Sequence, residues 1–197
     1  MNLSELGIKA RAASVLLAKM NVETKNKALI ACAEALVNES NSILEANAKD
    51  VLIGREKGMN EGLVDRLMLT EERIKGIAEG LEQVAALNDP VGEVLDMKKR
   101  PNGLLIGRKR VPLGVVGMIY EARPNVTPDA FALCFKSGNA VILRGGSDAI
   151  NSNIAIVKVL QDTLKACGIT EDAVQLIEDT SHEVGTEFMK MNGYLDV

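Results

Sequence analysis

The part of the chain beyond Pro112 alternates short apolar segments with amphipathic ones, and this alternation restricts the possible folds more than any other feature. GVVGMIY, AVIL and AVQLIE have the length and composition of buried strands. Helix start and stop signals stand between them: Thr127 with Pro128, Ser147 as a cap, and Gly138 and Gly168 after the last turns. Strands and helices in this order predict parallel β-α-β units of an α/β fold. A further helix at HEVGTEFMKM and a fourth strand at YLDV are expected to follow.

Residues 1–90 are predicted to form an N-terminal helical segment. From Thr24 onward, apolar side chains recur at helical spacing and define one buried face. Thr70 is expected to cap another helix, because Glu71 and Glu72 then fall in its first turn, where the helix dipole favours negative charge. That helix should end close to Pro90.

Residues 91–111 read as a β-hairpin whose two strands reverse at residues 100–103. Pro101 presets the backbone for a tight turn, and Gly103 accepts a positive φ. The basic residues of this hairpin favour a solvated face over a nucleic-acid patch, because no aromatic side chains interleave with them. The net charge of -4 also argues against a nucleic-acid partner.

No feature of the chain predicts a membrane segment, a disulfide framework or a metal site. The N-terminus lacks a basic region followed by an apolar one, so we expect a soluble cytoplasmic protein. The three cysteines are far apart and the single histidine has no ligand-like spacing. Cys134 shares a helix face with Phe131 and Phe135, which predicts a buried, structural thiol rather than a nucleophile.

Two strand ends hold the candidate site residues, because ligands of open parallel sheets bind beyond the carboxyl ends of the strands. Arg144 ends AVIL and is followed by Gly145, Gly146 and Ser147, an arrangement able to hold a phosphate or a ribose. A plain turn with a surface arginine explains the same residues equally well. Asn125 follows Pro124 at the other strand end, where its amide could stabilise an oxyanion or simply serve a turn.

The segment VPLGVVGMIYEARPNVTPDAFALCFKSGNAVILRGGSDA resembles the signature of the gamma-glutamyl phosphate reductase family, within the aldehyde dehydrogenase superfamily. The resemblance extends over essentially the whole chain, and YEARPN and GNAVILRGG are its most specific parts. It implies an aldehyde-dehydrogenase-like α/β fold: N-terminal helices, a hairpin of the oligomerisation type, and part of a Rossmann-like parallel sheet. Residues 112–197 would be the first part of the NADP-binding domain.

The resemblance also implies roles for individual residues. Asn125 falls where the superfamily has an oxyanion-stabilising asparagine. Arg144 falls where the superfamily has a lysine that contacts the adenosine ribose, and Ser147 where NAD-preferring members have a glutamate. A cation at the position of Arg144, without a carboxylate at the position of Ser147, favours NADPH over NADH. Gly145 and Gly146 would lie beside the cofactor.

The reaction implied is the NADPH-dependent reduction of L-glutamyl 5-phosphate to L-glutamate 5-semialdehyde and phosphate, in proline biosynthesis. A homo-oligomer, and association with the glutamate 5-kinase that makes the substrate, are implied partners. The nucleophilic cysteine of the family lies downstream of YLDV, and none of Cys32, Cys134 and Cys167 is in its motif. The chain alone is therefore expected to be inactive. A non-catalytic nucleotide-binding or assembly module is the alternative.

Overall fold

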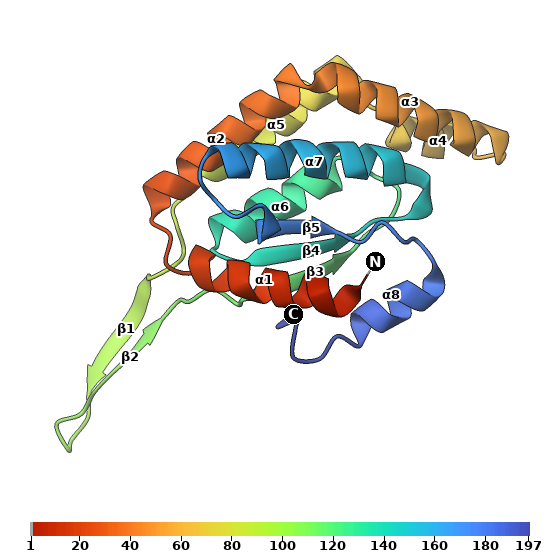
Figure 1. Ribbon diagram of the computed structural model, residues 1–197. Helices are drawn as coiled ribbons and strands as arrows, with labels where there is room; N and C mark the ends of the chain where they lie inside the picture. The colour runs from red at the N-terminus through yellow and green to blue at the C-terminus, as the bar shows by residue number, and fades with distance from the viewer. Residues whose placement is uncertain (1) are drawn as a thin grey trace.

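The computed structural model describes residues 2–197, and five helices precede the first strand within them (Figure 1). They are α1 (Leu3–Leu17), α2 (Val22–Asn38), α3 (Ser40–Glu56), α4 (Glu61–Leu67) and α5 (Glu71–Ala86). α2 packs against α5 along most of its length and also against the later helix α7 (Ile150–Ala166). The helical segment and the sheet therefore share one hydrophobic core.

Local capping explains where these helices begin. The Thr70 hydroxyl accepts a hydrogen bond from the amide of Arg73 at 3.1 Å, which confirms the predicted cap of α5. The helix expected from Thr24 begins two residues earlier, at Val22. The reason is that the Asn21 side chain is the cap, and the Thr24 amide donates to it at 2.8 Å.

The hairpin formed by β1 (Val94–Lys99) and β2 (Leu105–Lys109) projects away from the rest of the chain (Figure 1). Gly103 has a φ of +86° in the connecting turn, a backbone conformation that favours glycine. Apolar side chains on the hairpin are exposed, and no other part of residues 2–197 covers them; Leu105, for example, is 61% exposed.

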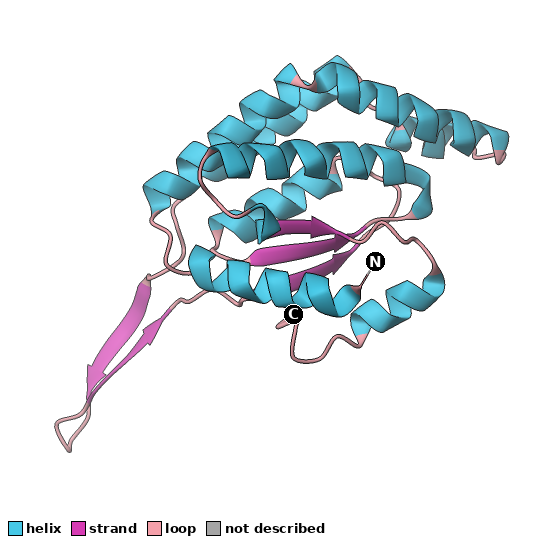
Figure 2. Cartoon of the chain, viewed as in Figure 1, coloured by secondary structure: helices cyan, strands magenta, loops and turns pink. Residues whose placement is uncertain are grey.

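The remaining strands form one parallel sheet in the order β3-β4-β5, which confirms the predicted α/β class. Its strands are β3 (Val115–Ile119), β4 (Ala140–Arg144) and β5 (Val174–Leu176). The connecting and following elements are α6 (Val126–Lys136), η1 (Ser147–Ala149), α7, η2 (Glu171–Ala173) and α8 (His182–Met189). α1 lies on one side of the sheet, while α6 and α7 lie on the other (Figure 2). Both faces are therefore buried, as a continuous run of apolar residues in β4 requires.

The segment YLDV does not form the regular strand that its sequence predicts. Its main chain meets β3 only at Asp196 and Val197. The amide of Asp196 donates to the Val115 carbonyl at 2.9 Å, and the amide of Gly117 donates to the Val197 carbonyl at 2.8 Å. These two bonds still place the segment beside the edge of the sheet.

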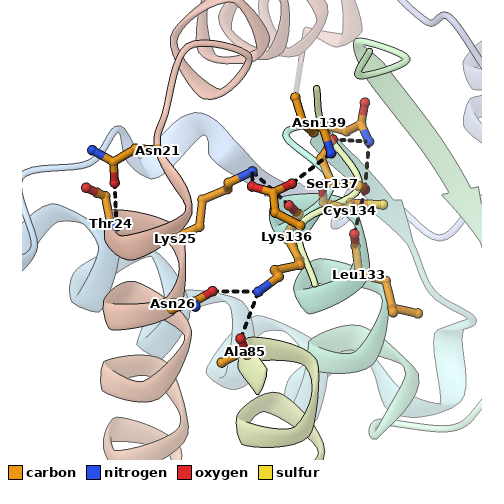
Figure 3. Close-up of polar contacts among 12 residues, drawn as sticks. Asn21, Thr24, Lys25, Asn26, Ala85, Leu133, Cys134, Lys136, Ser137 and Asn139 are labelled. Carbon is orange, nitrogen blue, oxygen red and sulfur yellow. Dashed lines mark hydrogen bonds and ion pairs between the residues drawn. The ribbon is translucent and has the colours of Figure 1, made fainter. Parts of the chain in front are cut away.

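A buried polar cluster joins α2, α5 and α6 (Figure 3). The Lys25 ammonium, 1% exposed, pairs with Asp89 and donates to the carbonyl of Lys136 at 3.0 Å. The Lys136 ammonium donates to the Asn26 side chain at 2.6 Å and to the Ala85 carbonyl at 2.7 Å. Burial lowers the pKa of Lys136, although the Asp89 carboxylate partly offsets this effect. The cluster fixes the helices next to the start of the hairpin.

Candidate functional site

The loop after β3 leads into α6, and its polar residues differ in role from the sequence expectation. α6 begins at Val126, so Thr127 lies inside the first turn instead of capping it. Thr127 is fully buried. Its hydroxyl donates to Asn153 Oδ1 at 2.7 Å and lies 2.6 Å from the Tyr120 hydroxyl. The side chain is therefore used to tie the end of β3 to α7.

The loop after β4 also departs from the expectation that Ser147 caps a helix. Ser147 starts the short η1 turn without a side-chain capping bond, and α7 begins three residues later. The cap of α7 comes from Asp50, on α3. Its carboxylate accepts from the amides of Asn151 at 3.2 Å and Ser152 at 2.8 Å, and from the Ser152 hydroxyl at 2.6 Å. Ser147 consequently keeps its hydroxyl available at the strand end.

A pocket of about 460 Å³ lies at the carboxyl ends of the strands, where the sequence placed a site. We call it the strand-end pocket. It brings together three of the predicted cofactor residues, Arg144, Gly146 and Ser147. Its lining comes from α4 and the loop before it, from the ends of β3 and β4 with the loops that follow them, and from the start of α8 with the segment before it. The lining residues are Met59, Leu63, Arg66, Ile119, Tyr120, Glu121, Ala122, Arg123, Arg144, Gly146, Ser147, Asp148, Thr180 and His182.

Arg144 is held in the strand-end pocket by the segment before α8. Its Nη2 donates to the carbonyls of Thr180 at 2.8 Å and Ser181 at 3.0 Å. Its Nε is buried and has no hydrogen-bond partner within residues 2–197. Because only Nη2 is bonded within the described residues, the Arg144 guanidinium, which lines the pocket, retains capacity to bind an anion or an oxygen acceptor.

The two glycines after Arg144 have different surroundings. A Cβ on Gly145 would lie 2.3 Å from Asn153 Nδ2, so this glycine permits close packing against α7. Gly145 does not line the strand-end pocket. A Cβ on Gly146 would meet nothing closer than 3.6 Å, and Gly146 faces the pocket. The space beside Arg144 and Ser147 thus fits a group as large as a nucleotide phosphate or ribose.

Asn125 lies in a second pocket, of about 490 Å³, which we call the Asn125 pocket. It is lined by Asp65, Arg66, Met68, Leu69, Arg73, Gly76, Ile77, Arg123, Asn125 and Asp129. The Asn125 side chain is exposed, and its Nδ2 lies 3.5 Å from Asp129 Oδ2. Burial raises the pKa of Asp129, and the bond from Asn125 partly offsets this effect. The residues predicted from the sequence therefore lie in two adjoining pockets: Asn125 in one, and Arg144 and Ser147 in the other.

Arg66 and Arg123 line both pockets, and sequence reasoning assigned neither of them to a site. Arg123 stands two residues before Asn125 within YEARPN, a local signal that could have identified it. Arg66, on α4, gave no such signal, because only tertiary packing brings α4 to the strand ends. His182 also lines the strand-end pocket, at the N-terminus of α8.

None of the cysteines lines either pocket. Cys134 is buried, as predicted, and burial raises the pKa of its thiol to about 11 and that of Cys32 to about 12. Cys167 is exposed at the end of α7.

Neither a metal site nor a membrane helix is found in the described residues. Residues 2–197 contain no cluster of three metal-ligating side chains. Nor does the described part of the chain contain a helix that is long and apolar enough to cross a membrane.

Known proteins with similar sequences include gamma-glutamyl phosphate reductases. A gamma-glutamyl phosphate reductase from Lachnospira eligens is 56% identical to the chain over 196 residues, which is 100% of the chain and 47% of that relative. The chain matches the N-terminal part of gamma-glutamyl phosphate reductases. The reductase from Heliobacterium modesticaldum is 57% identical over 99% of the chain and 47% of its own length. The chain thus spans about half the length of these curated relatives. No protein-family model matches it.

Solved structures extend this match to the fold. The crystal structure of gamma-glutamyl phosphate reductase from Thermotoga maritima superimposes with a TM-score of 0.96 at 46% identity, over 99% of the chain and 47% of that structure. A probable aldehyde dehydrogenase from Listeria monocytogenes gives a TM-score of 0.75 at 15% identity, over 98% of the chain and 40% of that structure. The fold is therefore that of the reductase and, more distantly, of aldehyde dehydrogenases.

Proposed function

We propose that the chain supplies the N-terminal, cofactor-side part of a reductase that converts L-glutamyl 5-phosphate to L-glutamate 5-semialdehyde and phosphate with NADPH. The observation that carries this proposal is the strand-end pocket, which gathers Arg144, Gly146 and Ser147 beyond the carboxyl ends of parallel strands. The similarity to gamma-glutamyl phosphate reductases supplies the substrate. A bound nicotinamide cofactor would supply the hydride for the reduction.

The preference for NADPH rests on the charges beside Arg144. Within residues 2–197 only the Nη2 of its guanidinium is hydrogen-bonded, and a 2′-phosphate would accept charge-assisted hydrogen bonds from this cation. Ser147 adds no negative charge that would repel this phosphate. A ribose hydroxyl gains less from the same guanidinium, because a neutral acceptor bonds a cation more weakly than an anion does.

Asn125 is proposed as the donor that stabilises the oxyanion formed on the reacting carbonyl. Its amide is exposed in the Asn125 pocket, and its one side-chain hydrogen bond, to Asp129, is long. We assign the nucleophilic thiolate to none of the three cysteines, since none lines a pocket and the two buried thiols resist ionisation at neutral pH. The chain alone should therefore bind cofactor without catalysing the reduction.

Cofactor binding tests this function. Ser147→Glu should weaken NADPH binding by about tenfold or more and leave NADH binding nearly unchanged, because the new carboxylate repels the 2′-phosphate. Arg144→Ala should weaken the binding of NADPH more than that of NADH, because it removes the guanidinium that binds the 2′-phosphate. Fluorescence titration of the chain with each cofactor measures both, and kcat/KM in a full-length reductase carrying this sequence extends the test to turnover.

Arg100→Ala is the matched control, since Arg100 lies in the hairpin turn outside both pockets. It should leave both affinities unchanged. Equal loss of NADPH and NADH in the two strand-end variants would show that the pocket does not distinguish the 2′ position. Ser147→Glu separates recognition from folding, because Ser147 caps no helix, whereas Arg144 also holds the segment before α8.

A second role, in assembly, is favoured by the hairpin. Its apolar side chains are exposed on an arm that no other part of residues 2–197 covers. Exposed apolar surface of this kind marks an interaction site. We therefore propose that β1 and β2 mediate contact between copies of the protein. This role is compatible with catalysis and does not replace it.

A further inference from the structure

We propose that Arg66 and Arg123 form a phosphate-binding pair at the border between the strand-end pocket and the Asn125 pocket. The proposal rests on the function proposed above and adds residues that hold a phosphate group beyond the 2′ position. It starts from the fact that these two side chains line both pockets. Asn125 lines one of these pockets and Arg144 lines the other.

The two guanidinium groups are not neutralised by the chain itself. Neither makes an ion pair or a side-chain hydrogen bond with another of the described residues. Four acidic residues also line the pockets. Asp65 is paired with Arg73 at 2.9 Å, and Asp129 accepts a long hydrogen bond from Asn125 at 3.5 Å. Neither these two nor Glu121 and Asp148 pair with Arg66 or Arg123 within residues 2–197. Two unpaired cations at the border of two pockets favour an anionic ligand there.

The backbone that carries Arg66 is held by side chains from two other parts of the chain. The Arg73 guanidinium donates to the carbonyls of Asp65 and Met68, the latter at 2.7 Å. The buried Asn47 side chain donates to the carbonyl of Leu67 at 2.8 Å and accepts from the amide of Leu69 at 2.7 Å.

Two side chains thus fix the five-residue segment from 65 to 69, while Arg66 within it keeps its own guanidinium unbonded. This arrangement fixes the point from which the exposed Arg66 side chain extends, so an anion that binds there orders the side chain but not the backbone.

The loop that carries Arg123 is also fixed. The amide of Arg123 donates to the Glu121 carbonyl at 2.9 Å, and the Arg123 carbonyl accepts from the amide of Val126 at 3.1 Å. Pro124, which follows, is buried and restricts the backbone further. Both arginines therefore extend from rigid backbone toward the same boundary.

A phosphate group is the ligand that this pair fits best. It carries up to two negative charges and accepts bidentate hydrogen bonds from planar guanidinium groups, and it has oxygens enough for both. Two sources share this chemistry within the proposed reaction: the phosphate released from the acyl phosphate, and the diphosphate of the dinucleotide cofactor. The position beside Asn125 favours the released phosphate, since that group leaves from the carbonyl which Asn125 would contact.

Titration of the chain with inorganic phosphate and, separately, with NADPH tests the pair. Binding of phosphate is followed by isothermal calorimetry for the native chain, Arg66→Gln, Arg123→Gln and the double variant. Each single change should weaken phosphate binding about tenfold, because it removes a charge-assisted contact. Arg100→Gln, in the hairpin turn, should bind phosphate like the native chain. Circular dichroism and urea unfolding verify that each variant remains folded.

Comparing the binding of inorganic phosphate with that of NADPH shows whether the arginine pair holds the released phosphate or the cofactor diphosphate. Loss of phosphate affinity with NADPH affinity retained assigns the pair to the released phosphate. Loss of NADPH affinity assigns it to the cofactor diphosphate.

Folded variants that bind both ligands like the native chain would overturn the proposal, as would a native chain that binds no phosphate at millimolar concentration. If the variants bind both ligands like the native chain, NADPH would still bind and Ser147→Glu would still weaken its binding. Failure of this inference is therefore distinguishable from failure of the proposed function.

Discussion

Cys134 illustrates how burial decides the chemistry of a single residue. The side chain is 7% exposed, and the rise of its pKa from 9.0 to about 11 lowers the thiolate fraction at neutral pH roughly 100-fold. Iodoacetamide should therefore modify exposed Cys167 first and leave Cys134 unmodified in the folded chain, as peptide mass spectrometry would measure. In guanidinium chloride all three cysteines should react alike. Rapid modification of Cys134 in the native chain would mean that its thiol is accessible and reactive.

At the level of elements, the hairpin of β1 and β2 exposes apolar side chains away from the core. Leu105→Ser should weaken self-association about tenfold or more, because a leucine buried at a subunit contact contributes about 1.5–3 kcal/mol. Sedimentation velocity across a concentration series measures the effect. Lys98→Ser changes a polar side chain of β1 and should leave association nearly unchanged. A native chain that stays monomeric at high concentration would contradict the role proposed for the hairpin.

At the scale of the whole molecule, Asp196 joins the two ends of the described chain. Its Oδ2 accepts from the Val115 amide at 2.8 Å and from Arg11 Nη1, on α1, at 2.6 Å. The bond from Val115, aided by Arg11, lowers the pKa of Asp196, so its stabilising effect is present above pH 3.8 and is lost as pH falls through the lower folded value. Asp196→Ala should cost about 1 kcal/mol at pH 7 in urea unfolding and progressively less in acid.

The surface residue Asp162, which is paired with Lys158, provides the control. Asp162→Ala should lower the free energy of unfolding at pH 7 by less than Asp196→Ala does. An equal cost of Asp196→Ala at all pH values would exclude an ionic contribution.

Features that depend on near neighbours in the chain could be predicted from the sequence. The Thr70 cap, the turn at Gly103 and the buried thiol of Cys134 follow from residues within one or two turns of each other. The alternation of strands and helices also fixed where a site would lie, since parallel strands bring their carboxyl ends to one edge. Arg144 and Ser147 were predictable for this reason.

The side chains that complete this edge come from distant parts of the sequence, and folding brings them together. Asp50 caps a helix that begins about 100 residues later, so the local signal at Ser147 predicted the wrong cap. Thr127 was expected to cap α6, but its hydroxyl is used by Tyr120 and Asn153. Arg66 reaches the strand ends solely because α4 packs there. A capping preference reflects one turn of backbone, whereas these contacts are selected by the free energy of burying polar groups with partners that only the folded chain brings near.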